Sequence, residues 1–310
     1  MHKCLSLVQY GGVVLIVRIA DDFDLDMIAG SGQCFRWEKK DRLVYRIIAG
    51  DRCLYLSAVD NDGDSASECF ELDCTLEEFD GFWREYFDLD ENYAAIRGRI
   101  DPKGDPFLFR AAEHEKGIRI LRQDPWEMLV SFIISQNKNI PAIRRSIELL
   151  AKACGEQKHD QRGELFYAFP TPEALAELGE DELRGCSLGY RCRYVHAAAD
   201  AVLNGVIDLD SLKEANEEHT IRSLCGLFGV GVKVANCVSL FGLHHIDAFP
   251  VDVWVKRILA NEYPDGYPCE RYRPYNGVYQ QYMFAYYRNL SGGVNDRAKD
   301  MGAETAPAKV

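Results

Sequence analysis

Apolar and polar residues alternate over the first part of the chain and then recur with a helical period. Between Leu5 and Val59 the apolar residues come in short runs rich in Val, Ile and Tyr, which are typical of β-strands. Within residues 43–58, two such runs flank the turn Ala49–Arg52, whose Gly-Asp centre favours a hairpin. The pattern therefore predicts an antiparallel sheet.

The helical period begins at Thr75 and continues through most of the remaining chain. Thr75 and Glu78 match a capping box at a helix N-terminus. Asp124 and Pro125 supply an N-cap and a first-turn proline to a helix that is apolar on almost every side from Trp126 to Ile134, so we expect it to be buried. Further helices are predicted over residues 172–183, 193–203 and 217–224.

Composition suggests where the two parts meet. The stretch Asp101–Pro106 concentrates Asp, Gly and Pro, which indicates a boundary. The sequence thus predicts an α+β protein, with an antiparallel β domain and flanking helices over residues 1–105 and an all-α domain over residues 106–290. Residues 291–310 are polar with several Gly and Ala, and they are predicted to form a disordered tail.

The net charge of −13 is unfavourable for a protein that binds phosphates, but it is unevenly distributed. Residues 1–105 contain 12 Lys and Arg against 22 Asp and Glu, a net −10, whereas residues 106–310 contain 24 against 27, a net −3. Nonspecific DNA affinity comes from basic side chains. The second part therefore remains free to present a local basic surface.

The cysteines and the apolar runs argue against several classes of protein. None of the eleven cysteines forms a CxxC pair, which disfavours a disulfide framework and a four-cysteine zinc or iron-sulfur site, so no metal is expected. The longest apolar run near the N-terminus, Val13–Val17, is too short to span a bilayer, and no targeting or membrane segment is expected. Reduced thiols indicate a cytosol-like compartment.

Leu224–Cys237, LCGLFGVGVKVANC, joins two helical patterns through a Gly-Val-Gly turn. Gly229 and Gly231 allow a tight hairpin, after which the second helix begins with unpaired backbone N–H groups. Such a helix N-terminus binds phosphate without side-chain charge, which is compatible with the acidic composition. Ordinary helical corners also contain GxG turns, so the turn alone leaves both interpretations open.

Two residues near this hairpin could perform chemistry. Lys233 lies in the first turn of the second helix between Val232 and Val234, where the helix dipole and apolar neighbours favour a neutral, nucleophilic amine. A lysine that only contacts phosphate is the alternative. Asp252 precedes another helical run as an N-cap, which would hold its carboxylate rigid beside a developing sugar cation. Together they could displace a base from DNA.

Further distinctive segments are spread over most of the chain. They are SGQCFRW at 31–37, LRQDPWEMLVSFIISQNKNI at 121–140, LGYRCRYV at 188–195 and YQQYMF at 279–284. Together with the hairpin and PVDVW at 250–254, these segments resemble the 8-oxoguanine DNA glycosylase family of the helix-hairpin-helix-GPD superfamily, in the family's own order. The resemblance is to a bacterial-type member, and Lys233 marks the lyase-competent branch.

The resemblance implies a fold and a function. The fold is a sheet domain similar to half of a TATA-binding protein, followed by a helix-hairpin-helix glycosylase domain. The function is excision of 8-oxoguanine from double-stranded DNA by a glycosylase and AP lyase in base excision repair. Such an enzyme is expected to act as a monomer, without a cofactor, on the nucleoid in the cytoplasm of a bacterium. Lys233 would attack the anomeric carbon to form a Schiff base, and Asp252 would stabilise the sugar cation.

The resemblance also implies a pocket for the flipped base. Gly32 would offer its backbone carbonyl to the ring N–H that distinguishes 8-oxoguanine from guanine, although its spacing alone indicates only a turn glycine. Cys237 and Phe284 would sandwich the base, and Gln280 would hydrogen-bond its pairing edge.

A second set of residues would hold the DNA. Asn137, Tyr190 and Arg191 match the family's residues that hold the space left by the flipped base and the cytosine opposite it. Two alternatives stay open: Tyr190 could be a core residue, and Arg191 could be a solvated charge. Gly229 and Gly231 would contact phosphate. Two positions depart from the better-known eukaryotic-type pattern: Ala142 replaces an arginine directed at the cytosine, and Trp254 replaces a histidine near the phosphate. Weaker discrimination for cytosine is expected.

Two other functions fit parts of the pattern. A helix-hairpin-helix glycosylase for another damaged base is one, but an alkylpurine enzyme would not need Lys233 and an iron-sulfur type would need clustered cysteines. A noncatalytic helix-hairpin-helix module that binds phosphates is the other. Covalent trapping of the enzyme on DNA separates them, because a binding module forms no adduct.

Overall fold

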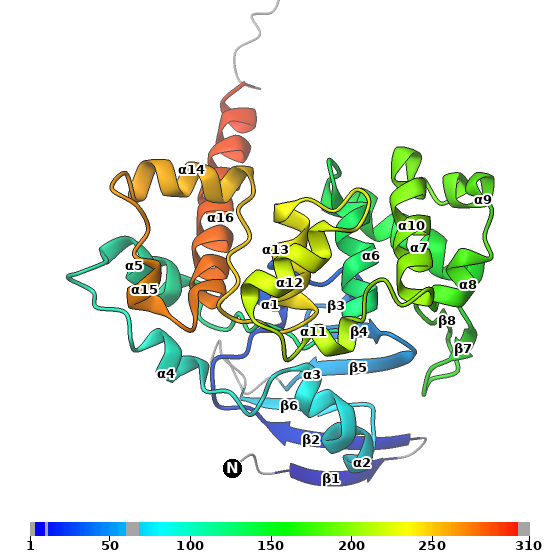
Figure 1. Ribbon diagram of the computed structural model, residues 1–310. Helices are drawn as coiled ribbons and strands as arrows, with labels where there is room; N and C mark the ends of the chain where they lie inside the picture. The colour runs from blue at the N-terminus through cyan, green and yellow to red at the C-terminus, as the bar shows by residue number, and fades with distance from the viewer. Residues whose placement is uncertain (1–3, 10–11, 60–67, 303–310) are drawn as a thin grey trace, which may run out of the picture.

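A six-stranded antiparallel sheet forms the first part of the chain in the computed structural model, which describes residues 4–9, 12–59 and 68–302. The strand order is β1-β2-β6-β5-β4-β3 (Figure 1). The strands are β1 (Cys4–Gln9), β2 (Gly12–Arg18), β3 (Trp37–Asp41), β4 (Val44–Ala49), β5 (Arg52–Ala58) and β6 (Cys69–Leu72). The predicted hairpin is confirmed as β4 and β5, which turn at Gly50 with a φ of +59°.

A short helix, α1 (Leu25–Gly30), interrupts the stretch that the alternation assigns to strands. Asp24 caps it by accepting a hydrogen bond from the Met27 N–H at 2.9 Å. The prediction was wrong here because six residues are too few for a helical period to stand out from a strand pattern. The loop Ser31–Gly32 follows directly, so α1 places the start of the SGQCFRW segment.

The helical turn predicted from Thr75 is confirmed, including the capping box between Thr75 and Glu78. It runs as α2 (Leu76–Glu78), a π-helical turn (Phe79–Trp83) and α3 (Arg84–Tyr86). Phe79 and Trp83 are buried on the sheet, in the same core as Leu54 and Leu56.

Helices make up most of the second part, as predicted. The elements are α4 (Tyr93–Arg97), α5 (Pro106–His114), α6 (Pro125–Ser135), α7 (Ile140–Cys154), α8 (Pro172–Ala176), α9 (Glu180–Gly185), the 3-10 turn η2 (Gly189–Arg191), α10 (Cys192–Leu203), α11 (Leu209–Leu212), α12 (Glu217–Cys225), α13 (Val232–Phe241), α14 (Val253–Glu262), α15 (Cys269–Tyr272) and α16 (Asn276–Gly302). Asp124 caps α6, which is buried from Pro125 to Ile134. The predicted helix over 172–183 is two helices, separated at Gly179.

A two-stranded hairpin lies within the part that the sequence predicts to be all-α. Its strands are β7 (Gln157–His159) and β8 (Leu165–Tyr167). Asp160, in the turn, accepts two hydrogen bonds from Arg46 of β4, at 3.0 and 2.7 Å. The hairpin therefore attaches the helical part to the sheet.

Two hydrophobic cores follow the two parts of the chain. Tyr93, Ile96 and Ile100 precede the predicted boundary at Asp101–Pro106 and pack in the helical core, while Leu121, beyond it, packs in the sheet core. The boundary at Asp101–Pro106 stays a prediction. The last two residues of that stretch begin a helix: Asp105 caps α5, and Pro106 is its first residue.

The last helix extends further than the sequence predicts. α16 continues past residue 291, the start of the predicted disordered tail, to Gly302, while residues 303–310 lie outside the described residues. Once a helix is anchored by buried residues, each added residue gains one hydrogen bond at little cost, so polar residues extend it. Among the described residues, every helix is too short or too polar to cross a membrane. The cysteines from Cys34 to Cys269 are free thiols.

Candidate active site

A pocket of about 60 Å³ lies where α1, α6, α13, α16 and the start of α14 meet. The residues expected to cut the bond or hold the base, Gly32, Lys233, Cys237, Asp252, Gln280 and Phe284, all line it. They come from opposite ends of the chain, so the fold brings them together.

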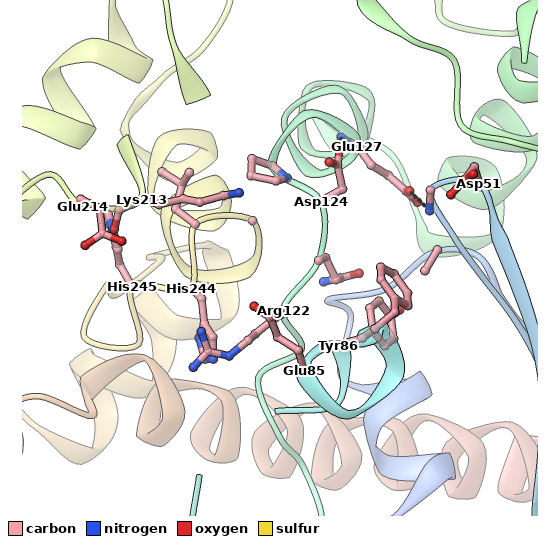
Figure 2. A pocket seen from close by; sticks show the side chains of 17 residues that line it. Asp51, Glu85, Tyr86, Arg122, Asp124, Glu127, Lys213, Glu214, His244 and His245 are labelled. Atoms are coloured by element: carbon pink, nitrogen blue, oxygen red, sulfur yellow. Dashed lines mark hydrogen bonds between the residues drawn. The ribbon is translucent and has the colours of Figure 1, made fainter. Parts of the chain in front are cut away.

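A larger cavity, of about 560 Å³, lies at the far end of α13 (Figure 2). It is lined by the start of α6 and by Gly242–His245, which follow α13. Lys233 is in the first turn of α13, and a helix of ten residues is about 15 Å long. The larger cavity is therefore not the candidate active site, since the predicted catalytic and base-binding residues line the smaller pocket.

Lys233 projects from the first turn of α13 at the surface. Its Nζ atom lies 5.5 Å from the centre of the Phe132 ring of α6. Val232 is 65% exposed and does not screen the amine from water, contrary to the expectation that both neighbouring valines do. The apolar contact that the site offers this lysine is the Phe132 ring, which helix packing brings from a distant part of the chain.

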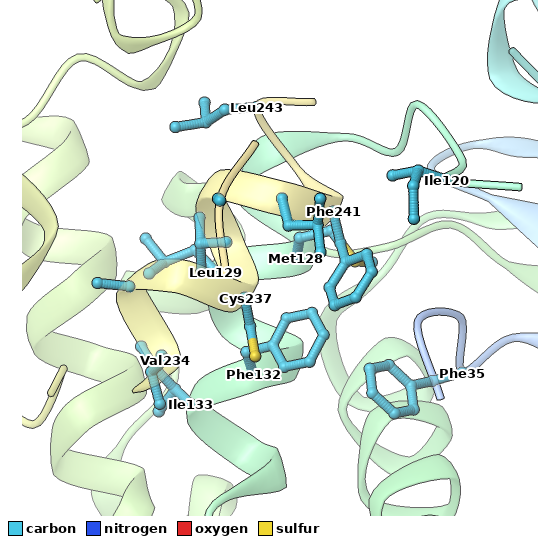
Figure 3. Packing of buried hydrophobic residues seen from close by; sticks show 14 of the residues in the cluster. Phe35, Ile120, Met128, Leu129, Phe132, Ile133, Val234, Cys237, Phe241 and Leu243 are labelled. Carbon is cyan, nitrogen blue, oxygen red and sulfur yellow. The ribbon is translucent and has the colours of Figure 1, made fainter. Parts of the chain in front are cut away.

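Cys237 is one turn further along α13 and is buried. Burial raises the pKa of its thiol to about 11, and the neighbouring Lys233 partly offsets this effect. The side chain is therefore a neutral thiol at pH 7. Figure 3 shows it beside Phe132, whose ring stacks on Phe241 with the centroids 5.5 Å apart. The polarisable sulfur of Cys237, next to the Phe132 ring, is suited to van der Waals contact with a flat base.

Asp252 caps α14, as predicted. Its Oδ1 atom accepts a hydrogen bond from the Val255 N–H at 2.8 Å. The cap fixes the carboxylate at the rim of the pocket that also contains Lys233.

Gln280 is 97% buried on α16, and the adjacent Gln281 donates from Nε2 to its Oε1 at 3.0 Å. This bond orients the Gln280 amide so that its NH₂ group can face a ligand. Gln281 also lines the pocket, as do Ser31, Phe132, Phe241 and Pro250, none of which the sequence assigned to the site. The pair of adjacent glutamines within the YQQYMF segment is a signal that could have identified Gln281.

Gly32 has a φ of +84°, in the left-handed region that favours glycine. A methyl group at its Cβ position would lie 3.7 Å from the Phe284 ring. Gln33, the next residue, donates from Nε2 to the Ser31 hydroxyl and to the Arg119 carbonyl, both at 2.8 Å. Gln33 thus ties the loop to Ser31 and to the segment at Arg119, with Gly32 beside the Phe284 ring.

The two hairpin glycines have different roles. Gly229 has a φ of +83°, and a Cβ there would come within 2.2 Å of the Tyr194 ring. Gly231 is the N-cap of α13 with an extended φ of −96° and open space at its Cβ position. Gly229 is therefore required by conformation and packing, whereas Gly231 leaves the first N–H groups of α13 uncovered.

The residues expected around the vacated space form a second group. Tyr190 is 53% exposed, which excludes a core position, and its ring lies under the Arg191 guanidinium. Arg191 is buried and donates from Nε to the Gln136 carbonyl at 2.7 Å, and also to the carbonyl of Asn137. Asn137 is exposed with a φ of +51°. Arg191 thus supports the backbone of Asn137, and its assignment to a partner cytosine stays a prediction.

The two departures from the eukaryotic-type pattern lie at helix starts. Ala142 is in the first turn of α7, where its N–H donates to the capping side chain of Asn139 at 3.0 Å. Trp254 is in the first turn of α14, with the Arg257 guanidinium 5.1 Å from its ring. Its contact with phosphate stays a prediction.

Two family models match consecutive parts of the chain. The 8-oxoguanine DNA glycosylase N-terminal domain matches residues 15–129, and the HhH-GPD superfamily of base excision DNA repair proteins matches residues 130–264. The matches include strands β3 to β6, α1, the helical hairpin and the helix that Asp252 caps.

Known proteins are similar to the chain over most of its length. N-glycosylase/DNA lyase OGG1 of Arabidopsis thaliana is 30% identical over 244 residues, 77% of this chain and 66% of that protein, so the chain spans about two thirds of that relative. The structure of MBOgg1 with a low-affinity DNA ligand is 35% identical with a TM-score of 0.84, covering 93% of this chain and 99% of that one. Clostridium acetobutylicum 8-oxoguanine glycosylase/lyase, in complex with double-stranded DNA containing cytosine opposite 8-oxoguanine, is 33% identical with a TM-score of 0.82, over 93% and 98%.

Proposed function

Because the chain belongs to the 8-oxoguanine DNA glycosylase family of the HhH-GPD superfamily, we propose that it removes 8-oxoguanine from duplex DNA and cleaves the resulting site as a lyase. The observation that carries the proposal is the convergence of Lys233, Asp252, Gln280 and Phe284 on one pocket, opposite Gly32. Lys233 and Asp252 act on the sugar, whereas Gly32, Gln280 and Phe284 recognise the base.

Bond cleavage uses the lysine and the aspartate. The Lys233 amine attacks the anomeric carbon, and the glycosidic electron pair leaves with the base. The Asp252 carboxylate stabilises the positive charge that develops on the sugar, and its cap hydrogen bond keeps it in place without reorganisation. Loss of a proton and opening of the sugar ring then leave a Schiff base on Lys233, from which the strand is cleaved by elimination.

Recognition of the lesion depends on one backbone carbonyl. The carbonyl of Gly32 accepts a hydrogen bond from the ring N–H of 8-oxoguanine, whereas guanine presents a lone pair at that atom and is repelled. An unmatched buried polar pair costs about 1 to 3 kcal/mol. Gln280 reads the pairing edge, and the ring of Phe284 and the sulfur of Cys237 cover the two faces. Flipping costs a few kcal/mol, which these contacts offset.

DNA is held chiefly by backbone groups. The uncovered N–H groups that follow Gly231 bind a phosphate, which reconciles the acidic composition with the substrate. Tyr190 and Asn137 occupy the space that the flipped base vacates. We infer that the enzyme needs no cofactor, because a lysine supplies the nucleophile. We also infer that it acts as a monomer on the nucleoid.

Trapping with borohydride tests the proposed function. The wild-type chain is incubated with a duplex that carries one 8-oxoguanine, and reduction is expected to give a covalent protein–DNA adduct. A duplex with guanine at that position is the control. An adduct with an already abasic duplex but none with 8-oxoguanine would reassign the enzyme to another lesion, and the lack of any adduct would indicate a binding module.

Phe284→Ala is expected to weaken binding of the lesion duplex, because one face of the base loses its stacking partner. Stacking of a base on an aromatic ring is worth about 1 to 3 kcal/mol, so the dissociation constant should rise about 5- to 150-fold in a fluorescence anisotropy titration. Leu290→Ala is the control, since Leu290 lies on the same helix and is 52% exposed. Equal affinities for wild type and Phe284→Ala would assign Phe284 to packing only.

Selectivity for the opposite base is expected to be weak, because Ala142 cannot hydrogen-bond a cytosine. Single-turnover excision rates opposite cytosine, adenine and thymine should agree within about threefold, less than the roughly tenfold effect of one good base contact. Ala142→Arg should raise the relative rate opposite cytosine, since Ala142 is partly exposed at the start of α7. A strong cytosine preference of the wild type would overturn this prediction.

A further inference from the structure

The short helix α1 ends directly before the loop that carries Gly32. The last carbonyls of a helix have no partner inside it, and α1 has no basic residue in its own last turn. Two arginines from the helical part of the chain supply donors instead. Arg144 of α7 donates from Nη2 to the Ala29 carbonyl at 3.3 Å, and Arg288 of α16 donates from Nη2 to the Gly30 carbonyl.

Arg288 also touches the other wall of the pocket. Its guanidinium carbon lies 5.3 Å from the centre of the Phe284 ring, and its Nη1 atom lies 3.9 Å from the position that a Cβ on Gly32 would take. One side chain therefore connects the backbone that precedes Gly32 with the ring that stacks on the base. Burial lowers the pKa of Arg288, the carboxylates of Glu115 and Asp252 oppose this effect, and an arginine remains charged at neutral pH.

Arg144 reaches the same helix end from another side. It is partly buried, and its Nε atom has no hydrogen-bond partner among the described residues. At 3.3 Å its bond to Ala29 is slightly longer than the usual range for an N–H···O hydrogen bond. Arg144 is therefore the weaker of the two contacts, and Arg288 should have the larger effect.

We propose that Arg144 and Arg288 are positioning residues that hold the end of α1, and with it the Gly32 carbonyl, at the distance from Phe284 at which 8-oxoguanine is read. The proposal rests on the proposed function, because it assigns lesion reading to Gly32. Neither arginine touches the sugar or the amine of Lys233. They act on the loop that carries Gly32, whereas Lys233 is on α13. The charge of Arg288 also favours the ionised Asp252 carboxylate, and Arg288→Lys retains that charge.

Two substrates separate recognition of the base from the chemistry. Excision of 8-oxoguanine needs the Gly32 loop, whereas strand cleavage at a preformed abasic site needs Lys233 but no base contact. Arg288→Leu is expected to lower the single-turnover excision rate about tenfold, the effect of losing one charge-assisted hydrogen bond, while abasic-site cleavage stays within about twofold. Arg144→Leu should lower excision about threefold, consistent with a longer and weaker bond.

Conservative and control variants complete the experiment. Arg288→Lys keeps a charged donor for the Gly30 carbonyl but loses the planar contact with Phe284, so it should recover part of the excision rate. The double variant Arg144→Leu/Arg288→Leu should lose less than the product of the two single losses, because both act on one helix end. Lys152→Leu removes a charge from the exposed end of α7 and should change neither reaction.

The outcomes are distinct. A loss confined to excision supports the proposal, and an equal loss on both substrates, or no loss with Arg288→Leu, overturns it. If the wild type cleaves abasic DNA but does not excise 8-oxoguanine, the proposed function fails before the arginines are tested.

Discussion

Lys233→Gln is expected to abolish both base release and borohydride trapping on an 8-oxoguanine duplex. Glutamine is one atom shorter than lysine and keeps a polar end group, but its amide is not a nucleophile. Removal of a covalent nucleophile costs on the order of 10⁴-fold or more in rate. Single-turnover excision followed by gel electrophoresis measures this loss, and reduced samples report the adduct.

Binding of the lesion duplex should survive this change. The base contacts of Gly32, Gln280 and Phe284 do not include the amine, so the dissociation constant should stay within about threefold, less than the effect of one hydrogen bond. Lys152→Gln, on the exposed end of α7, is the matched control and should behave as wild type. An adduct that persists in Lys233→Gln would assign the nucleophile to another amine.

Asp252→Asn is expected to slow excision about 10²- to 10³-fold, the usual loss when one electrostatic group that stabilises the transition state is removed. Asparagine caps a helix about as well as aspartate. The bond to the Val255 N–H is therefore retained while the charge beside the sugar is lost. The midpoint of thermal unfolding should hardly change, which separates an effect on catalysis from one on folding.

Two further substitutions check this reading. Asp252→Ala removes the charge and the cap together, so it should slow excision by the same factor and also destabilise the fold by about 1 kcal/mol. Asp208→Asn alters a capping aspartate of α11, which is not part of the pocket, and should leave excision unchanged. A wild-type rate for Asp252→Asn would mean that Asp252 acts only as a cap.

Local signals in the sequence were sufficient for the elements that carry Lys233, Cys237 and Asp252. Lys233 and Cys237 are four residues apart on one helix and must share a face, and an aspartate ahead of a helical run caps it. The same kind of signal identified the buried helix α6 and the β4–β5 hairpin. These features depend on residues within a few positions of one another, so they can be read without knowledge of the fold.

Packing between distant segments accounts for what the sequence did not reveal. Six-residue α1 is too short for its periodicity to be seen, yet it sets the position of Gly32, whose place beside Phe284 was implied only by resemblance. The Phe132 ring beside Lys233, and the burial of Arg191 against the Asn137 backbone, likewise arise between residues far apart in the chain.

The residue types and spacings were therefore sufficient to predict a candidate nucleophile, a capped carboxylate and a helix start with uncovered N–H groups, since these are local properties. The position of the Gly32 loop relative to Phe284 could not be predicted in this way. Arg144 and Arg288 reach the end of α1 from two separate helices, and we propose that they hold the Gly32 loop beside Phe284. Such contacts exist only after the sheet and the helices have packed, because long-range burial brings their partners together.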